Sequence, residues 1–205
     1  VVVHYEGKSN GTDLSSGIKK YQVENSIQMK NKWREEIKNQ YAVGQCVFKA
    51  RERSRDKKVI LVIDHYVPHF DKDAGSRTIY QYIKMFIQKG YSVKFIGDNF
   101  YQHEPYTSLL QQMGVEVLYG PWYAQHWQEW ILENKEYIDF AFLNRPHITI
   151  KYIDFLKDNT NIKCLYYCLD LHFLRLQREY ELTGDKTKLE EAENWKKQEL
   201  YIMRK

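Results

Sequence analysis

The chain has 205 residues, of which 43% are hydrophobic and 28% charged, with a formal net charge of +4. This apolar content is ample for a packed interior and excludes a disordered chain, while the length is too short for two complete enzymes. No run approaches the roughly 18 apolar residues of a membrane-spanning helix and no signal pattern opens the sequence, so we expect a soluble, cytoplasmic protein.

The first part of the chain predicts little structure of its own. Residues 1–17 begin with VVVHY, which is typical of a strand already under way, and continue as a glycine- and serine-rich turn region. Residues 18–37 predict a helix whose larger apolar residues are Tyr21, Ile27 and Trp33. Neither piece has enough apolar partners to form a core. Because no initiator Met precedes the strand, we expect the chain to begin inside a domain.

A basic stripe, KARERSRDKK, occupies residues 49–58 and overlaps a segment that we interpret as a linker, residues 41–57. The stripe has six basic and two acidic residues, a surplus equal to the net charge of the whole chain. Two interpretations stay open: a solvated linker, or a peripheral contact with anionic lipid at the inner face of the membrane. No aromatic residue is interleaved with the stripe, so we expect no nucleic-acid partner.

From residue 58 onward, strands and helices alternate regularly. Short runs of apolar and β-branched residues predict strands, and apolar residues at helical spacing predict the helices between them. The predicted strands are residues 59–64, 92–97, 115–120, 139–144 and 164–170. Right-handed crossovers then give an α/β fold, a Rossmann-like doubly wound parallel sheet over residues 58–185, after a mostly helical N-terminal extension. A charged C-terminal helix, residues 186–205, completes the chain.

Turn residues mark several helix ends. In the helix after the first of these strands, Ser76 is the expected N-cap and Gly90 the expected C′ residue. Pro105 opens the next helix and Gly114 ends it. The C-terminal helix is expected to dock on the sheet domain through its larger apolar residues, Leu189, Trp195, Leu200 and Tyr201.

Parallel sheets of this class bind ligands beyond the carboxyl ends of their strands, where the first loop contains DKDAGSR, residues 71–77. A glycine at the start of a helix, with free N–H groups from Ser76, Arg77 and Thr78 and the positive end of the helix dipole, is compatible with an anion or sugar-phosphate site. A tight turn at Gly75 with Ser76 as a cap explains the same residues equally well.

The loop after the fourth strand offers a second candidate. Arg145 supplies a fixed cation and His147 an imidazole that suit a phosphate or an acceptor hydroxyl, or else the two residues have structural roles. Asp71 and Asp73 have the spacing of a cation site, but solvated carboxylates are the favoured interpretation. The sequence lacks the motifs of nicotinamide dehydrogenases, nucleotide triphosphatases, hydrolases and zinc enzymes. The cysteines are expected to be reduced: Cys46, Cys164 and Cys168.

Four ordered motifs carry a resemblance to a known family: VILVIDHYVPHFDKDAGSRTIYQYIKMFIQKGYSVKFIGDN, YTSLLQQMGVEVLYGP, FLNRPH and YYCLDLHFLRLQREYELTGD. Together they resemble the N-terminal half of GT-B glycosyltransferases related to family 4, over roughly residues 57–185. The resemblance implies that this part binds a glycan or lipid-linked acceptor, while a second, C-terminal GT-B domain binds the nucleotide sugar, usually without a metal. The substrate-binding residues predicted on this basis are Asp73, Gly75, Ser76, Arg77, Arg145, His147, Asp170 and His172.

The segment before the linker, residues 1–40, resembles the closing stretch of family 2 glycosyltransferases with a GT-A fold. In that family a late histidine often joins a divalent-metal site, and His4 matches it. The resemblance implies a bifunctional parent protein that builds a surface polysaccharide or a related glycan, of which this chain is a fragment without activity of its own. The alternative from another class is a non-catalytic Rossmann-like module that binds a small anion or a partner.

Overall fold

The computed structural model of the chain describes residues 8, 11–52 and 54–205. It divides into two compact units, Val1–Arg55 and Asp56–Lys205, and each is described by itself. Both the strand expected at the start of the chain and His4 lie outside the described residues.

The first unit consists of short helices: α1 (Lys20–Lys32), α2 (Arg34–Lys38) and α3 (Val47–Ala50). The helix predicted over residues 18–37 is therefore interrupted at Trp33, where φ is −107° and ψ is 26°. Neither α1 nor α2 buries any residue, and Tyr21, Ile27 and Trp33 are each about half exposed. The expectation that this region has too few apolar partners for a core is confirmed for the described residues of α1 and α2.

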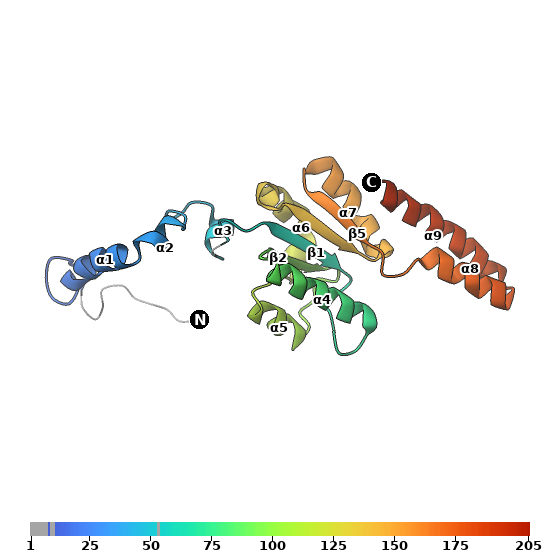
Figure 1. The fold of residues 1–205 in the computed structure, drawn as a ribbon, viewed down its shortest axis with the longest axis horizontal. Helices are drawn as coiled ribbons and strands as arrows, with labels where there is room; N and C mark the ends of the chain where they lie inside the picture. The colour runs from blue at the N-terminus through green and yellow to red at the C-terminus, as the bar shows by residue number, and fades with distance from the viewer. Residues whose placement is uncertain (1–7, 9–10, 53) are drawn as a thin grey trace. The chain divides into compact units, whose positions relative to one another are not determined.

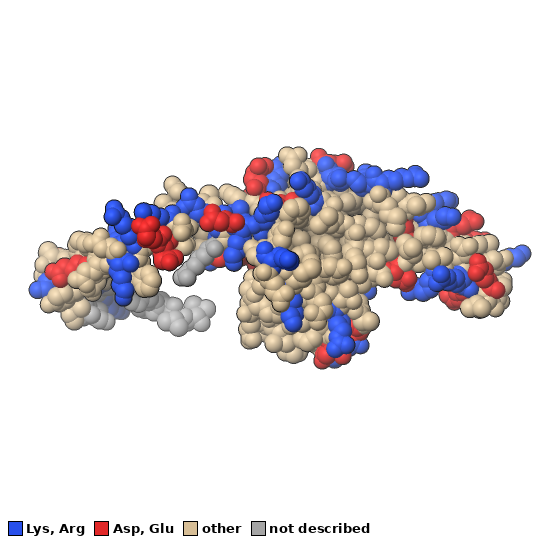
Figure 2. Space-filling model, viewed as in Figure 1, with Lys and Arg blue, Asp and Glu red and all other residues tan. Residues whose placement is uncertain are grey.

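Charge separates between the two units. Residues 1–55 have 11 basic and 6 acidic residues, a net charge of +5, whereas residues 56–205 have 20 basic and 21 acidic residues, a net charge of −1. Figure 2 shows many Lys and Arg side chains over the described part of the first unit, while the middle of the visible face of the second unit is largely uncharged. The positive charge of the chain thus belongs to the extension and the linker.

The second unit has the predicted α/β architecture (Figure 1). Its elements in chain order are β1 (Val59–Asp64), α4 (Ala74–Gln88), β2 (Ser92–Gly97), α5 (Tyr106–Gln112), β3 (Glu116–Leu118), α6 (Pro121–Asn134), a 3₁₀ turn (Lys135–Tyr137), β4 (Phe140–Asn144), α7 (Pro146–Asn159), β5 (Lys163–Tyr167), α8 (His172–Thr183) and α9 (Lys186–Arg204). The strand order is β3-β2-β1-β4-β5, and every strand pair is parallel.

Helices cover both faces of this sheet, because the side chains of each strand alternate between them. Ile60 and Val62 of β1 face the core formed with α4 and α5, in which Ile79 and Ile83 are fully buried. The intervening residues of β1 face α7, which lies on the opposite side of the sheet in Figure 1. Burying each such aliphatic side chain stabilises the fold by roughly 2 kcal/mol. The doubly wound fold class is therefore confirmed.

Two predicted helix ends are confirmed, and the prediction for the C-terminal helix needs correction. Gly90 and Gly114 follow the C-caps of α4 and α5 with φ values of +84° and +88°, which glycine adopts without strain. Helix α9 packs against α8 and α7, but Leu200 is 38% exposed. The buried face of α9 consists of Ala192, Glu199 and Ile202.

Candidate functional site

The candidate site lies at the point where the strand order reverses. The chain proceeds from β1 outward to β3 and then returns to β4 on the other side of β1. In open parallel sheets, the carboxyl ends of the strands at such a reversal are where ligands bind. We call the residues at this edge, with those that follow β5, the rim. Asp64 ends β1 and Asn144 ends β4. The sequence-based prediction named the loops that meet here.

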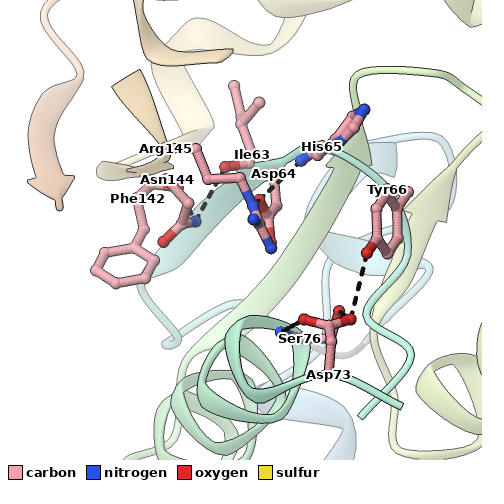
Figure 3. Close-up of polar contacts among 9 residues, drawn as sticks. All are labelled: Ile63, Asp64, His65, Tyr66, Asp73, Ser76, Phe142, Asn144 and Arg145. Atoms are coloured by element: carbon pink, nitrogen blue, oxygen red, sulfur yellow. Dashed lines mark hydrogen bonds and ion pairs between the residues drawn. The ribbon is translucent and has the colours of Figure 1, made fainter. Parts of the chain in front are cut away.

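A buried ion pair joins the end of β1 to the residue that follows β4 (Figure 3). The Asp64 side chain is 2% exposed, and its Oδ1 accepts a hydrogen bond of 2.7 Å from Nε of Arg145. The backbone N–H of His65 donates to the same oxygen at 2.8 Å. Burial raises the pKa of Asp64, while the positive charge of Arg145 opposes that shift. The pair fixes the guanidinium at one place on the rim.

The backbone of Arg145 is itself unusual. Its φ is +61° and its ψ is 130°, a conformation that costs a non-glycine residue roughly 1–3 kcal/mol. Next to it, Nδ2 of the buried Asn144 donates 3.0 Å to the carbonyl oxygen of Ile63, which ties the end of β4 to β1. The surrounding fold therefore holds Arg145 in a strained position, as is common for residues at functional sites.

The start of α4 lies beside Arg145, and here one prediction is wrong. The N-cap is Asp73, not Ser76: Oδ1 of Asp73 accepts 2.7 Å from the Ser76 N–H and Oδ2 accepts 2.6 Å from the Ser76 hydroxyl. Tyr66 also donates to Oδ2, at 3.2 Å. Burial raises the pKa of Asp73, but these hydrogen bonds outweigh burial and lower it. Asp73 accepts from three donors and precedes the helix, whereas Ser76 is the third helical residue, so the carboxylate is the cap.

The same geometry changes which N–H groups remain available to an anion. The N–H groups of Ser76 and Arg77 donate to Asp73, so the predicted set of Ser76, Arg77 and Thr78 is wrong. The N–H groups of Ala74 and Gly75 remain, since the first N–H groups of a helix have no acceptor within it. A Cβ atom on Gly75 would lie 3.0 Å from Nη2 of Arg145, so the glycine permits the guanidinium to approach the helix start.

Arg145 and the N-terminus of α4 thus place two positive electrostatic centres side by side. Two carboxylates oppose this positive charge: Asp64 pairs with Arg145, and Asp73 caps α4 and interacts electrostatically with Arg145. An anionic oxygen bound between Arg145 and the helix start would gain from both positive centres, which is the general basis of phosphate binding at helix N-termini.

Three imidazoles continue the rim from β1 to β5. The ring centroids of His65 and His147 lie 5.6 Å apart, and those of His147 and His172 lie 6.1 Å apart. Burial lowers the pKa of His147 to about 4, and the neighbouring charges of His65, His172, Arg145 and Lys151 act in the same direction. His147 is therefore neutral near pH 7 and can donate or accept a hydrogen bond without adding charge to the rim.

The eight predicted substrate-binding residues separate into three sets. Contacts or close approaches join the first set, Asp73, Gly75, Ser76 and Arg145. His147 and His172 form the second set, beside the first. The remaining two are less closely joined to these sets: Arg77 is exposed and lines an open hollow of about 250 Å³ at the start of α4, together with Asp73 and Ala74, and Asp170 is paired with Arg175 at 2.8 Å on an exposed surface.

Several residues at this edge were not singled out from the sequence. Asp64 closes an apolar strand, and a carboxylate at the end of a buried run is a signal that could have identified it. Glu199, 27 residues beyond His172, accepts the His172 N–H at 2.8 Å. No local pattern indicates this contact, because only the packing of α9 creates it.

The residues with metal-ligand spacing have other partners. Asp71 accepts 2.6 Å from the Tyr106 hydroxyl, and Asp73 caps α4. Among the described residues, no group of three or more His, Cys, Asp or Glu side chains is arranged to hold a metal ion. Within the same part of the chain, none of the helices combines the length and apolar character needed to cross a bilayer. His4, which the resemblance assigns to a metal, is not described.

Comparisons of the chain with protein-family models, with curated proteins and with solved structures found no match.

Proposed function

We propose that this chain supplies the acceptor-side half of a glycosyltransferase, which moves a sugar from a nucleotide-sugar donor to a glycan or a lipid-linked acceptor. The observation that carries the proposal is the position of the Arg145 guanidinium, held by the buried Asp64 against Gly75 at the start of α4. This arrangement suits the diphosphate of a nucleotide sugar, and it lies where open parallel sheets bind their ligands.

The chemistry of glycosyl transfer gives each part of the rim a role. The leaving nucleoside diphosphate gains negative charge as the glycosidic bond breaks, so a fixed cation and a helix N-terminus stabilise the transition state more than the ground state. Arg145 and the N–H groups of Ala74 and Gly75 have this role. The imidazoles of His147 and His172 lie farther along the rim, where they bind hydroxyl groups of the acceptor or of the transferred sugar.

The proposal includes a second Rossmann-like domain that binds the nucleoside part of the donor, as the family resemblance implies. Glycosyl transfer then takes place between two facing lobes. The chain by itself is expected to bind diphosphates weakly and to transfer no sugar, because only one wall of the site is present.

Binding of UDP and of inorganic pyrophosphate to the ¹⁵N-labelled chain, followed by NMR, tests the anion site. We expect both probes to shift the amide resonances of Ala74 and Gly75. Gly75→Val places methyl groups where the guanidinium lies, since even a Cβ atom would be 3.0 Å from Nη2. We expect this variant to weaken binding at least about tenfold, or 1.4 kcal/mol. Lys89→Gln, at an exposed position at the C-terminal end of the same helix, removes a charge and should retain binding.

Three outcomes decide between the alternatives. Equal binding by wild type and Gly75→Val, or equal losses in Gly75→Val and Lys89→Gln, would refute the anion site. Diphosphate binding without sugar transfer, in this chain and in a polypeptide that also carries the second Rossmann-like domain, would favour the non-catalytic anion-binding module. Robust transfer by this chain alone would overturn the assignment of the donor site to another domain.

A further inference from the structure

A buried carboxylate lies behind the β5 end of the rim, where α9 packs beside the start of α8. Glu199 of α9 is fully buried. Its Oε1 accepts 2.8 Å from the backbone N–H of His172, the first residue of α8. Burying a carboxylate costs free energy unless other groups compensate its charge. The contacts of Glu199 are therefore a guide to its role.

The same oxygen also faces the imidazole ring of His172. Nδ1 of His172 lies 3.2 Å from Oε1 of Glu199, in a bent arrangement that falls short of an aligned hydrogen bond. The neighbouring polar groups, Tyr166 and Cys168, do not compensate the carboxylate: burial raises the pKa of both, and the charge of Glu199 adds to each shift. The backbone N–H of His172 is thus the hydrogen-bond donor to Oε1 of Glu199, the ring of His172 lies beside the same oxygen, and Oε2 has no hydrogen-bond partner among the described residues.

Packing fixes the orientation of this ring toward the rim. The indole of Trp195, one turn before Glu199 on α9, stacks on the His172 ring with centroids 5.0 Å apart and an interplanar angle of 29°. The side chain of His172 is 19% exposed, while its Nδ1 is buried. Because Nδ1 is buried against Glu199, the ring nitrogen left to contact a ligand is Nε2, on the opposite edge.

We propose that Glu199 is a positioning residue: it holds His172 in the tautomer with the proton on Nδ1, so that Nε2 accepts a hydrogen bond from a hydroxyl group of the ligand at the rim. A negative charge beside one ring nitrogen favours the proton on that nitrogen, as in carboxylate–histidine pairs generally. The role of the hydroxyl rests on the proposed sugar-transfer function. The assignment of the tautomer does not depend on that function.

The tautomer is measured without any ligand. Long-range ¹H–¹⁵N spectra of the full chain distinguish a protonated from an unprotonated ring nitrogen, and His172→Gln identifies the His172 signals. We expect the wild type to show Nδ1 protonated and Nε2 unprotonated when the ring is neutral. Glu199→Gln keeps the shape and removes the charge, and we expect the proton to redistribute to Nε2. Glu193→Gln, at an exposed position on the same helix, should leave the spectrum unchanged.

A wild-type spectrum with the proton on Nε2 would overturn the proposal even if Glu199→Gln failed to fold. An unchanged tautomer in a folded Glu199→Gln would overturn it as well, since a merely structural carboxylate would not control the ring. If the tautomer behaves as expected but UDP and pyrophosphate do not bind, the proposed function fails while the role of Glu199 stands.

Discussion

The pH dependence of stability provides the sharpest test of the rim, through His147. Burial and four neighbouring basic groups lower the pKa of this imidazole from 6.5 to about 4 in the folded protein. In the unfolded chain His147 is solvated and separated from those groups, so its pKa is near the ordinary value. Replacing His147 with Gln removes the titrating ring and keeps a polar side chain of similar reach.

The direction in which stability changes with pH follows from proton binding to His147. Between pH 4 and pH 6.5 the unfolded state holds more protons on His147 than the folded state does, so the free energy of unfolding rises with pH and reaches its full value above pH 6.5. The shift corresponds to a ceiling of roughly 3 kcal/mol at 1.36 kcal/mol per pH unit. Because the side chain is only half buried, solvent screening reduces this, and we expect about 1–2 kcal/mol.

The assay is urea unfolding of wild type and His147→Gln at several pH values from 4 to 8, followed by tryptophan fluorescence. Four of the five Trp residues belong to the second unit, so the signal reports mainly on the sheet domain. We expect the variant to lose less stability than wild type as the pH falls. His126→Gln removes a ring from α6, away from the rim, and should keep the wild-type slope. Equal slopes in wild type and His147→Gln would refute the reasoning.

Three further predictions use the same unfolding assay. Asp73→Ala removes the cap of α4 and should cost about 1 kcal/mol; an unchanged midpoint would contradict the capping role. Arg145→Ala leaves a buried carboxylate without its partner and should cost about 3 kcal/mol, much of it recovered when Asp64→Asn is combined with it; no recovery would argue against the ion pair as the cause. Ile202→Ala should cost about 2–4 kcal/mol through a cavity, whereas Leu200→Ala should cost well under 1 kcal/mol; equal costs would contradict the observed packing face of α9.

Much of the architecture could be predicted because it depends on local patterns. The strands at residues 59–64 and 92–97 were predicted with their observed bounds, since each is a short segment with β-branched and other apolar residues, and both are buried along their whole length. Alternation of strands with helices then fixed the crossover handedness and the parallel sheet. The predictions at Gly90 and Gly114 succeeded because a left-handed residue after a helix favours glycine whatever the surroundings.

The partners of polar side chains were harder to predict, since they depend on which elements come together. Asp73 competes with Ser76 for the cap of α4, and Tyr66 and Arg145 enter that competition only after the loops have packed. Asp64 and Arg145 are 81 residues apart in the chain, and no spacing rule links residues across such a separation.

The sequence by itself determined the doubly wound sheet and which loops would reach its carboxyl edge, because periodicity and turn residues act within a few positions. Only the tertiary structure decided that Arg145 would pair with Asp64 beside Gly75, and that Glu199 would be buried behind His172. The physical reason is that both arrangements compensate buried charge, and burial is a property of the assembled fold rather than of any segment.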